Sequence, residues 1–330
     1  MKNKKLETLG FCLSLAFGSL FVGACGDSNE DDDGSGSAGE TAETTADTTG
    51  DGDGDGDCGG THTKNAGGAA AGEACTDDAD CESNLCLMYT DVPPDTMAVC
   101  APQPDSCKTR IAGTVFEFPT MTPVADANVK VAGAIGAASN PTNAPAQAEG
   151  STDAMGRFDM VSNDQIDQPL GIVGIVTKEG YHLSATGVQS PQVGNNYGPG
   201  TGIHDVWAVN QTTLDGWNTA LAGDANLAEF LPLGDEGGVI GFARDAATGG
   251  PKAGVTVVQG DSSNAQVRYL NATGDAFDAA ATTDSGVFIL VNPGLGENFG
   301  AALNGTDVDG VSGTAGSTSG SLFILIMDIP

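Results

Sequence analysis

Six cysteines within fifty residues are the side chains whose type and spacing most clearly indicate chemistry. They are Cys58, Cys75, Cys81, Cys86, Cys100 and Cys107. In an exported chain such a cluster predicts three disulfides, with 15 possible pairings that the sequence leaves open. Zinc is the alternative, but zinc modules typically contain close pairs of the CxxC type, and this segment has none. We therefore expect a disulfide-rich module over residues 58–110 and no metal.

Candidate catalytic residues are few. The three histidines, His62, His182 and His204, show no HExxH or other close ligand spacing. The tripeptide ending at Ser262 is similar to the Gly-Asp-Ser of a lipase-like hydrolase family, but no Asp-x-x-His follows it. Catalysis requires a defined constellation of groups. We therefore expect no catalytic residue and no cofactor.

Alternating Asp and Gly over residues 51–57 suggest a calcium loop. An EF-hand loop needs a Glu at its twelfth position, whereas counting from Asp51 reaches His62. We interpret the segment as a solvated linker on which cations condense weakly.

The N-terminus has the pattern of a secretory signal. Lys2, Lys4 and Lys5 precede an apolar stretch over residues 9–22. This stretch is too short to span a bilayer, which takes about 20 residues. A basic start, a short apolar run and small residues predict a signal peptide over residues 1–24.

The end of this segment, Val22-Gly23-Ala24-Cys25, resembles the lipobox of bacterial lipoproteins. The resemblance implies lipid attachment at Cys25 and anchorage to a membrane, which several acyl chains make stable. Gly26 at the next position implies sorting to the outer membrane or cell surface. The alternative is an ordinary cleaved signal with an incidental cysteine.

Net charge excludes one class of partner and predicts a tether. The 330 residues contain 44 acidic and 12 basic side chains, a net charge of −32. Nucleic acid binding requires a basic footprint, so we exclude it. Residues 26–57 hold twelve carboxylates and no base. Such a segment cannot bury enough apolar surface to fold, and we expect residues 25–57 to form a disordered acidic linker.

An internal repeat covers residues 111–330. Segments that begin at Gly113 and Pro123 recur 128 residues later, at Gly241 and Pro251. After each proline, apolar residues alternate, which predicts a strand with one buried face.

A second block of the repeat predicts a tight turn. The sequence TDAMGRF at 152–158 matches TDSGVF at 283–288, with one residue inserted in the first copy. Asp153 and Asp284 can accept hydrogen bonds from backbone N–H groups of the turn. Gly156 and Gly286 can adopt the positive φ that the turn requires.

The order of these motifs resembles the carboxypeptidase regulatory-like domains, which are small transthyretin-like β-sandwiches of Ig-like architecture. The resemblance implies two tandem sandwiches and is nearly silent about function. The first copy departs from the pattern at Asp126, where the family has Gly. It also has an insert over residues 134–150, which we expect to be an exposed loop.

Residues between the two copies predict a helical clip. Residues 203–209 alternate like a closing strand, as residues 322–329 do in the second copy. Thr212 and Asp215 have the spacing of a capping box, and apolar residues then recur at helical spacing. We expect Trp207 and Trp217 to be buried rather than to form a platform for an aromatic ligand.

The sequence thus predicts a mainly β chain. Its expected parts are a signal peptide (1–24), a lipidated Cys25 with its linker (25–57), a disulfide module (58–110), a first sandwich (111–210), a helical connector (211–236) and a second sandwich (237–330). We expect a non-enzymatic surface lipoprotein that binds a protein or a carbohydrate. The alternatives are an accessory subunit of an exported enzyme and, less favoured, an unrecognised hydrolase. The sequence gives no oligomeric state.

Overall fold

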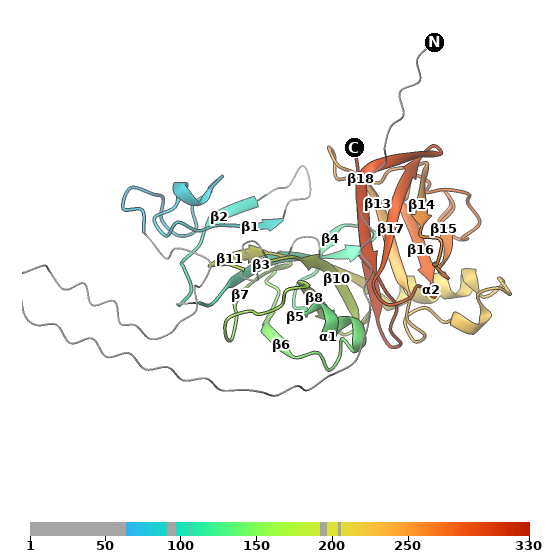
Figure 1. Ribbon diagram of the computed structural model, residues 1–330, viewed down its shortest axis with the longest axis horizontal. Coiled ribbons are helices and arrows are strands. Elements are labelled where there is room, and N and C mark those ends of the chain that lie inside the picture. The colour runs from blue at the N-terminus through green and yellow to red at the C-terminus, as the bar shows by residue number, and fades with distance from the viewer. Residues whose placement is uncertain (1–63, 91–96, 106, 192–196, 204–205) are drawn as a thin grey trace, which may run out of the picture. The chain divides into compact units, whose positions relative to one another are not determined.

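The computed structural model describes residues 64–330 except 91–96, 106, 192–196 and 204–205 (Figure 1). The described part is mainly β, as predicted. Its helices are short, and none of those described is long and apolar enough to cross a membrane.

Strands occur in the N-terminal module and in both copies of the repeat. The disulfide module contains β1 (Cys86–Thr90) and β2 (Met97–Cys100). The first copy contains β3 (Arg110–Phe118), β4 (Thr122–Pro123), β5 (Asn128–Gly133), α1 (Ala134–Ser139), β6 (Ala146–Ser151), β7 (Arg157–Val161), β8 (Ile172–Thr177), β9 (Tyr181–His182), β10 (Ser184–Gln189), β11 (Gly200–Gly202) and β12 (Val206–Asn210). The connector contains α2 (Gln211–Leu221) and a 3₁₀ turn (Ala228–Phe230). The second copy contains β13 (Val239–Asp245), β14 (Val255–Gln259), β15 (Gln266–Tyr269), β16 (Val287–Val291), β17 (Glu297–Leu303), β18 (Thr306–Ala315) and β19 (Leu322–Ile329).

Both copies pair their strands in the same order. In the first copy β3 pairs antiparallel with β7 and parallel with β12, and in the second β13 pairs in the same way with β16 and β19. The other sheet of each copy runs β5-β8-β10 or β14-β17-β18. The predicted closing strands therefore return beside the first strand of their own copy.

Buried threonine hydroxyls hold equivalent positions in the two copies. The Thr152 hydroxyl accepts from the Ala127 N–H (2.9 Å) and donates to the Val124 carbonyl (2.7 Å). The Thr282 hydroxyl accepts from the Val255 N–H (2.9 Å) and donates to the Lys252 carbonyl (2.8 Å). Thr152 thus corresponds to Thr282. The predicted alignment with residue 283, and the inserted residue it required, are wrong.

Glycines on the first strands make room for a phenylalanine on the neighbouring strand. Gly113 lies opposite Phe158, and Gly241 lies opposite Phe288. A Cβ at either glycine would lie 2.4 or 2.1 Å from the phenylalanine ring. Since no real side chain packs this closely, the ring requires glycine there.

Both predicted turn glycines have positive φ, +75° at Gly156 and +67° at Gly286. Asp153 accepts from the N–H groups of Met155 and Arg157 (2.8 and 2.9 Å). In the second copy the hydroxyls of residues 283 and 285, rather than Asp284, accept the turn's N–H groups. This follows from the corrected alignment, because the residue equivalent to Asp153 is a threonine.

The insert of the first copy is not an exposed loop. Residues 134–139 form α1, and residues 146–151 form β6, which pairs antiparallel with β5. Ala137 and Ala144 are buried against Val173 and Ala185, on the outer face of the sheet. Small side chains let the insert pack closely on that sheet. Asp126 has φ +50° where Gly254 of the second copy has +79°, so the first copy keeps the same backbone bend with an aspartate.

The two copies share one sheet, which the sequence did not predict. Residues 184–186 of β10 pair parallel with residues 322–324 of β19. The result is an eight-stranded sheet with the order β15-β16-β13-β19-β10-β8-β5-β6. β19 therefore closes the second copy and also joins it to the first.

The connector covers the second copy instead of only linking the two. All five residues of β16 are buried. Val287, Ile289 and Val291 lie in a core with α2, while Phe288 and Leu290 face the core between the sheets. Burial on both faces explains why β16 is continuously apolar.

Phe118 lies at the centre of an aromatic cluster, in the core that α2 shares with β16. Its ring packs edge-on against Trp207 (5.6 Å), Trp217 (6.0 Å) and Phe242 (5.9 Å). These rings come from β12, α2 and β13. Both tryptophans are buried, as predicted.

The helix of the connector starts earlier than predicted. Asn210 is its N-cap, and the Asn210 side chain accepts from the Thr212 N–H (2.9 Å). Asp215 accepts from the Gln211 side chain (2.8 Å). The predicted capping box is therefore wrong, because α2 already begins at Gln211.

We predict that Gly286→Ala and Gly156→Ala each lower the free energy of unfolding by at least about 2 kcal/mol. The alanine would have to adopt positive φ. Its Cβ would lie 2.6 Å from the Ala243 oxygen in Gly286→Ala and 2.9 Å from the Val115 oxygen in Gly156→Ala. Chemical denaturation followed by circular dichroism measures the loss. The control is Gly216→Ala in α2, where space is open and a gain of about 0.5–1 kcal/mol is expected. Equal stability of all three variants would contradict the proposed role of the turns.

Candidate functional site

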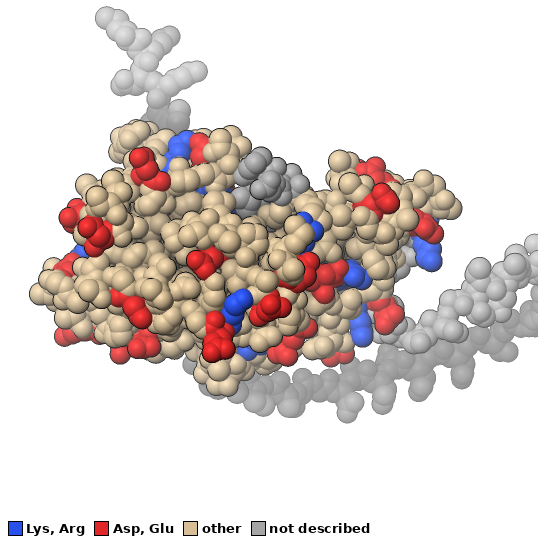
Figure 2. All heavy atoms as spheres, turned by 180° about the vertical axis from the view of Figure 1, so that it is seen from behind, with Lys and Arg blue, Asp and Glu red and all other residues tan. Residues whose placement is uncertain are grey.

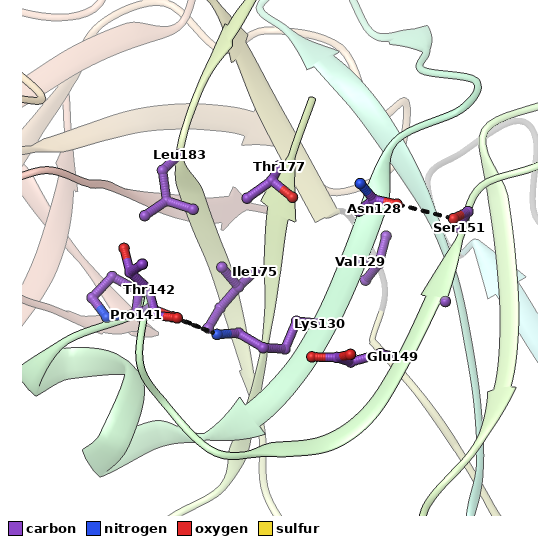
Figure 3. Close-up of a pocket in the computed structure, with 11 residues that line it drawn as sticks. Asn128, Val129, Lys130, Pro141, Thr142, Glu149, Ser151, Ile175, Thr177 and Leu183 are labelled. Atoms are coloured by element: carbon purple, nitrogen blue, oxygen red, sulfur yellow. Dashed lines mark hydrogen bonds between the residues drawn. The ribbon is translucent and has the colours of Figure 1, made fainter. Parts of the chain in front are cut away.

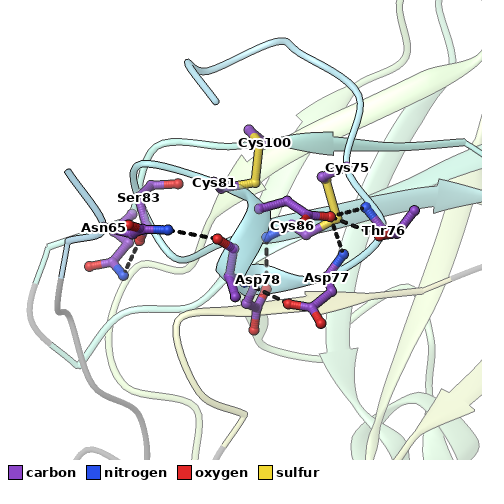
Figure 4. Close-up of a disulfide and its surroundings, with 12 residues drawn as sticks. Asn65, Cys75, Thr76, Asp77, Asp78, Cys81, Ser83, Cys86 and Cys100 are labelled. Atoms are coloured by element: carbon purple, nitrogen blue, oxygen red, sulfur yellow. Dashed lines mark hydrogen bonds between the residues drawn. A yellow bond between two sulfur atoms is a disulfide. The ribbon is translucent and has the colours of Figure 1, made fainter. Parts of the chain in front are cut away.

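Two disulfides cross-link the small N-terminal module. Cys75 bonds to Cys86 and Cys81 to Cys100 (Figure 4), with Cα separations of 5.9 and 5.3 Å. Cys107 is also disulfide-bonded. The other predicted disulfide cysteine, Cys58, and the predicted lipid site, Cys25, lie outside the described residues.

The sulfur atoms of Cys75, Cys81 and Cys100 lie within 4.8 Å of one another. Zinc would require thiolates at this position. All three sulfurs are committed to disulfides, so the zinc alternative is not supported for these residues.

Aspartates of the module accept hydrogen bonds from its backbone (Figure 4). Asp80 accepts from the N–H and hydroxyl of Thr76 (2.8 Å each), and these bonds lower the pKa of Asp80. Asp77 accepts from the Ala79 N–H (2.7 Å), and Asp78 accepts from the Cys86 N–H (2.7 Å). The three carboxylates thus stabilise turns.

The module packs on the first strand of the first copy. Leu85 and Leu87 share a small core with Ala112 of β3. The Tyr89 hydroxyl donates to Asp159 (2.7 Å), which also forms an ion pair with Arg110 (2.7 Å). Burial is the main cause that raises the pKa of Tyr89, so the phenol remains a donor. The module and the first copy are therefore joined by apolar packing and by the hydrogen bond from Tyr89 to Asp159.

A pocket of about 450 Å³ lies on the sheet of β5, β6 and β8 (Figure 3). Lys130 points across it, and its amine donates to the carbonyls of Pro141 (2.8 Å) and Thr142 (2.9 Å). Glu149 lies opposite Lys130 on the neighbouring strand. Because the amine binds carbonyls of the insert, Lys130 holds the insert on the sheet.

The described candidate catalytic residues do not form a site. Ser262 is exposed between β14 and β15. His182 lies in β9 with its ring against Gly234, where a Cβ would be 2.6 Å from Nε2. No described hydrogen bond joins a serine hydroxyl to this ring, and His62 and His204 lie outside the described residues. The four predicted turn residues belong to two separate turns of the fold.

A larger groove, of about 830 Å³, lies along β18 and β19 and reaches the first copy. We call it the β18 groove and define it by residues 312–316, 323–326, Ile135 and Leu170, all of which line it. Arg244 and Asp328 also line it, and they pair with each other at 2.6 Å. The groove is thus lined by apolar side chains together with uncharged polar ones such as Gln189 and Asn298, and its two charged side chains pair with each other. No sequence motif pointed to it because its residues come from distant segments.

The charged side chains of the described surface are dispersed. Figure 2 shows carboxylates scattered over one face, several of them beside Lys or Arg, with wide uncharged areas between. Ion pairs such as Lys252–Asp245 (2.7 Å) and Arg268–Asp224 (2.7 Å) account for part of this mixing. The Lys252 contact is the main cause that lowers the pKa of Asp245 to about 2.

Comparisons with known proteins give no family. No protein-family model matches the chain, and no curated protein does. Among solved structures it is similar to the Bacillus anthracis TIE protein at 12% identity (TM-score 0.18), over 67% of this chain and 34% of that one, so the chain spans about a third of its length. It is also similar to the shaft pilin SpaA from Lactobacillus rhamnosus GG at 12% identity (TM-score 0.19; 68% and 99% covered) and to a streptococcal ancillary pilin at 12% identity (TM-score 0.20; 73% and 68% covered). Similarities this weak support no conclusion about function.

We predict that the double variant Cys81→Ala/Cys100→Ala opens the module and leaves the rest of the fold intact. The two residues lie 19 apart, and a disulfide closing such a loop contributes about 3 kcal/mol. Trypsin should then cut the variant, but not the unmodified chain, after Lys108, as mass spectrometry would show, while the far-ultraviolet circular dichroism of the β strands persists. Met88→Ala, which changes an exposed residue of β1, is the control. Loss of the whole β signal would contradict the prediction.

Proposed function

We propose that this chain is an exported surface lipoprotein that displays two β-sandwich modules for binding. The disulfides support export, because such bonds persist in oxidising compartments outside the cytosol. The signal pattern and the lipobox at Cys25 support lipid anchorage, and the acidic linker would hold the folded part away from the membrane. The mixed charge of the folded surface suits solubility.

We further propose that each copy is a transthyretin-like sandwich of the carboxypeptidase regulatory-like type. The equivalent strand order and the equivalent bonds of Thr152 and Thr282 support this. In such a fold the repeated residues shape turns and cores, so they carry no activity of their own.

The observation that carries a binding function is the β18 groove. It combines a volume of about 830 Å³ with walls of apolar and uncharged polar side chains and with charges that are already paired. A permanent partner, as in an accessory subunit, would use the same surface and would co-purify stoichiometrically.

We predict that Cys25→Ser abolishes lipid attachment and releases the protein from the membrane fraction. Intact mass and fractionation of cells that express the full chain measure both effects. Cys58→Ser is the matched control, because it removes a cysteine of the predicted module and should retain the lipid. A membrane-bound, acylated Cys25→Ser protein would contradict the lipobox interpretation.

We predict that trypsin added to intact cells that express the Cys58→Ser variant releases the folded part by cutting after Lys64. The variant is used because a disulfide of Cys58 would keep the cut linker attached to the folded part. No Lys or Arg lies between Cys25 and Lys64, and Lys64 is exposed. Mass spectrometry should identify a released fragment that begins at Asn65. Release only after permeabilisation would place the chain on the inner side of the outer membrane and contradict surface display.

A further inference from the structure

β18 is an edge strand with an open side. It pairs with β17 and is the outermost strand of the β14-β17-β18 sheet, as far as the structure describes the chain. Its equivalent in the first copy, β10, occupies the same place in the strand order, but residues 184–186 of β10 are covered by β19. One position of the fold is therefore filled in the first copy and free in the second.

The two halves of β18 differ in how they resist pairing. The first half has exposed carboxylates at Asp307 and Asp309, a positive φ at Gly310 and a register shift in the ladder with β17. Charges and irregularities are the features that keep edge strands from pairing. The second half, Val311–Ala315, has no charge and no proline. Protection therefore stops where β18 reaches the groove.

Side chains in this second half alternate in direction. Ser312 and Thr314 are exposed, whereas Ala315 is buried. A Cβ on Gly313 would lie 2.3 Å from Leu325, so Gly313 faces the core. The backbone is regular here, and its ladder with β17 pairs Ser312 with Gly300 and Thr314 with Asn298. Such a strand can accept another strand on its free side.

Apolar side chains border this edge. Ile135 and Leu170 line the groove and are 61% and 64% exposed, and Leu295, which precedes the lining residue Gly296, is 64% exposed. These are the three most exposed large apolar side chains of the described residues. A cluster of this kind marks an interaction surface.

We propose that the Val311–Ala315 edge of β18 binds an extended segment of a partner protein as an added strand. Main-chain hydrogen bonds to β18 give the affinity, and alternate apolar side chains of the segment enter the groove. A Lys or Arg of the segment lies beside Asp307 and Asp309. The inference rests on the proposed binding function and names its partner class and site.

A second copy of this chain fits the site less well. Its net charge of −32 opposes self-association. In a dimer that repeated the β10–β19 contact, β11 of one molecule would pair with β18 of the other. β11 is the equivalent of the start of β19, because Thr201 pairs with Ile111 as Phe323 pairs with Val239, and Ile111 and Val239 lie 128 residues apart. Thr201 lacks the apolar ring with which Phe323 packs on the first copy. The charge and the residue types favour a basic, apolar segment of another protein.

The test uses the full chain in detergent and a fluorescent nine-residue peptide. The peptide has valine and isoleucine at alternate positions, threonine between them and lysine at each end. We expect saturable binding by fluorescence polarisation, and slower hydrogen exchange of residues 311–315 but not of residues 306–309. Two further peptides carry N-methyl groups on alternate amides, one in each register. One should lose binding and the other keep it, since a strand presents alternate amides to its neighbour.

Ile135→Ser with Leu170→Ser should weaken binding at least about five-fold through lost apolar contact. Both residues are mostly exposed, so the fold is retained. The matched control is Met155→Ser, which removes an exposed apolar side chain outside the groove and should leave binding unchanged.

Several outcomes overturn the inference. They are no binding up to about 1 mM peptide, equal binding of a scrambled peptide, or equal binding of both N-methylated peptides. Protection of residues 311–315 that depends on protein concentration alone would assign the edge to a second copy. Capture of a protein or a glycan with residues 311–315 unprotected would refute this site and leave the proposed binding function standing.

Discussion

Pairing of β19 on both of its edges is the interaction on which the described fold depends. β13 runs along one edge of β19 over seven residues, and β10 meets the other edge over three. The first contact completes the second copy, and the second contact makes the two copies one sheet. Because the same strand does both, loss of β19 would open a core and break the shared sheet at the same time.

Apolar packing reinforces this connection. Phe118, Trp217 and Phe242 come from the first copy, the connector and the second copy, and their rings meet in one cluster. The connector helix then buries the outer face of β16. A sheet covered on both faces tolerates only apolar residues there, which links the composition of β16 directly to the position of α2.

The described strands differ in whether their edges are covered. The disulfide module covers part of the first copy, and β19 covers the edge of β10. β18 has no such cover among the described residues. The first half of β18 carries aspartates, and its second half adjoins the β18 groove. A binding role would therefore use an edge whose equivalent in the first copy, the edge of β10, is already covered.

Local patterns in the sequence determined the mainly β class, the repeat, the closing strands and the positive φ of Gly156 and Gly286. These features depend on side-chain period and on turn chemistry, which act over a few residues. Local pattern misassigned the residue equivalent to Thr152, since Thr282 and its neighbour look alike until their hydrogen bonds are known. Only the tertiary structure decided the pairing of Cys75 with Cys86, the packing of residues 134–150, the β10–β19 contact and the groove. Each of these joins segments far apart in the chain, and the free energy of such contacts depends on partners that no local pattern specifies.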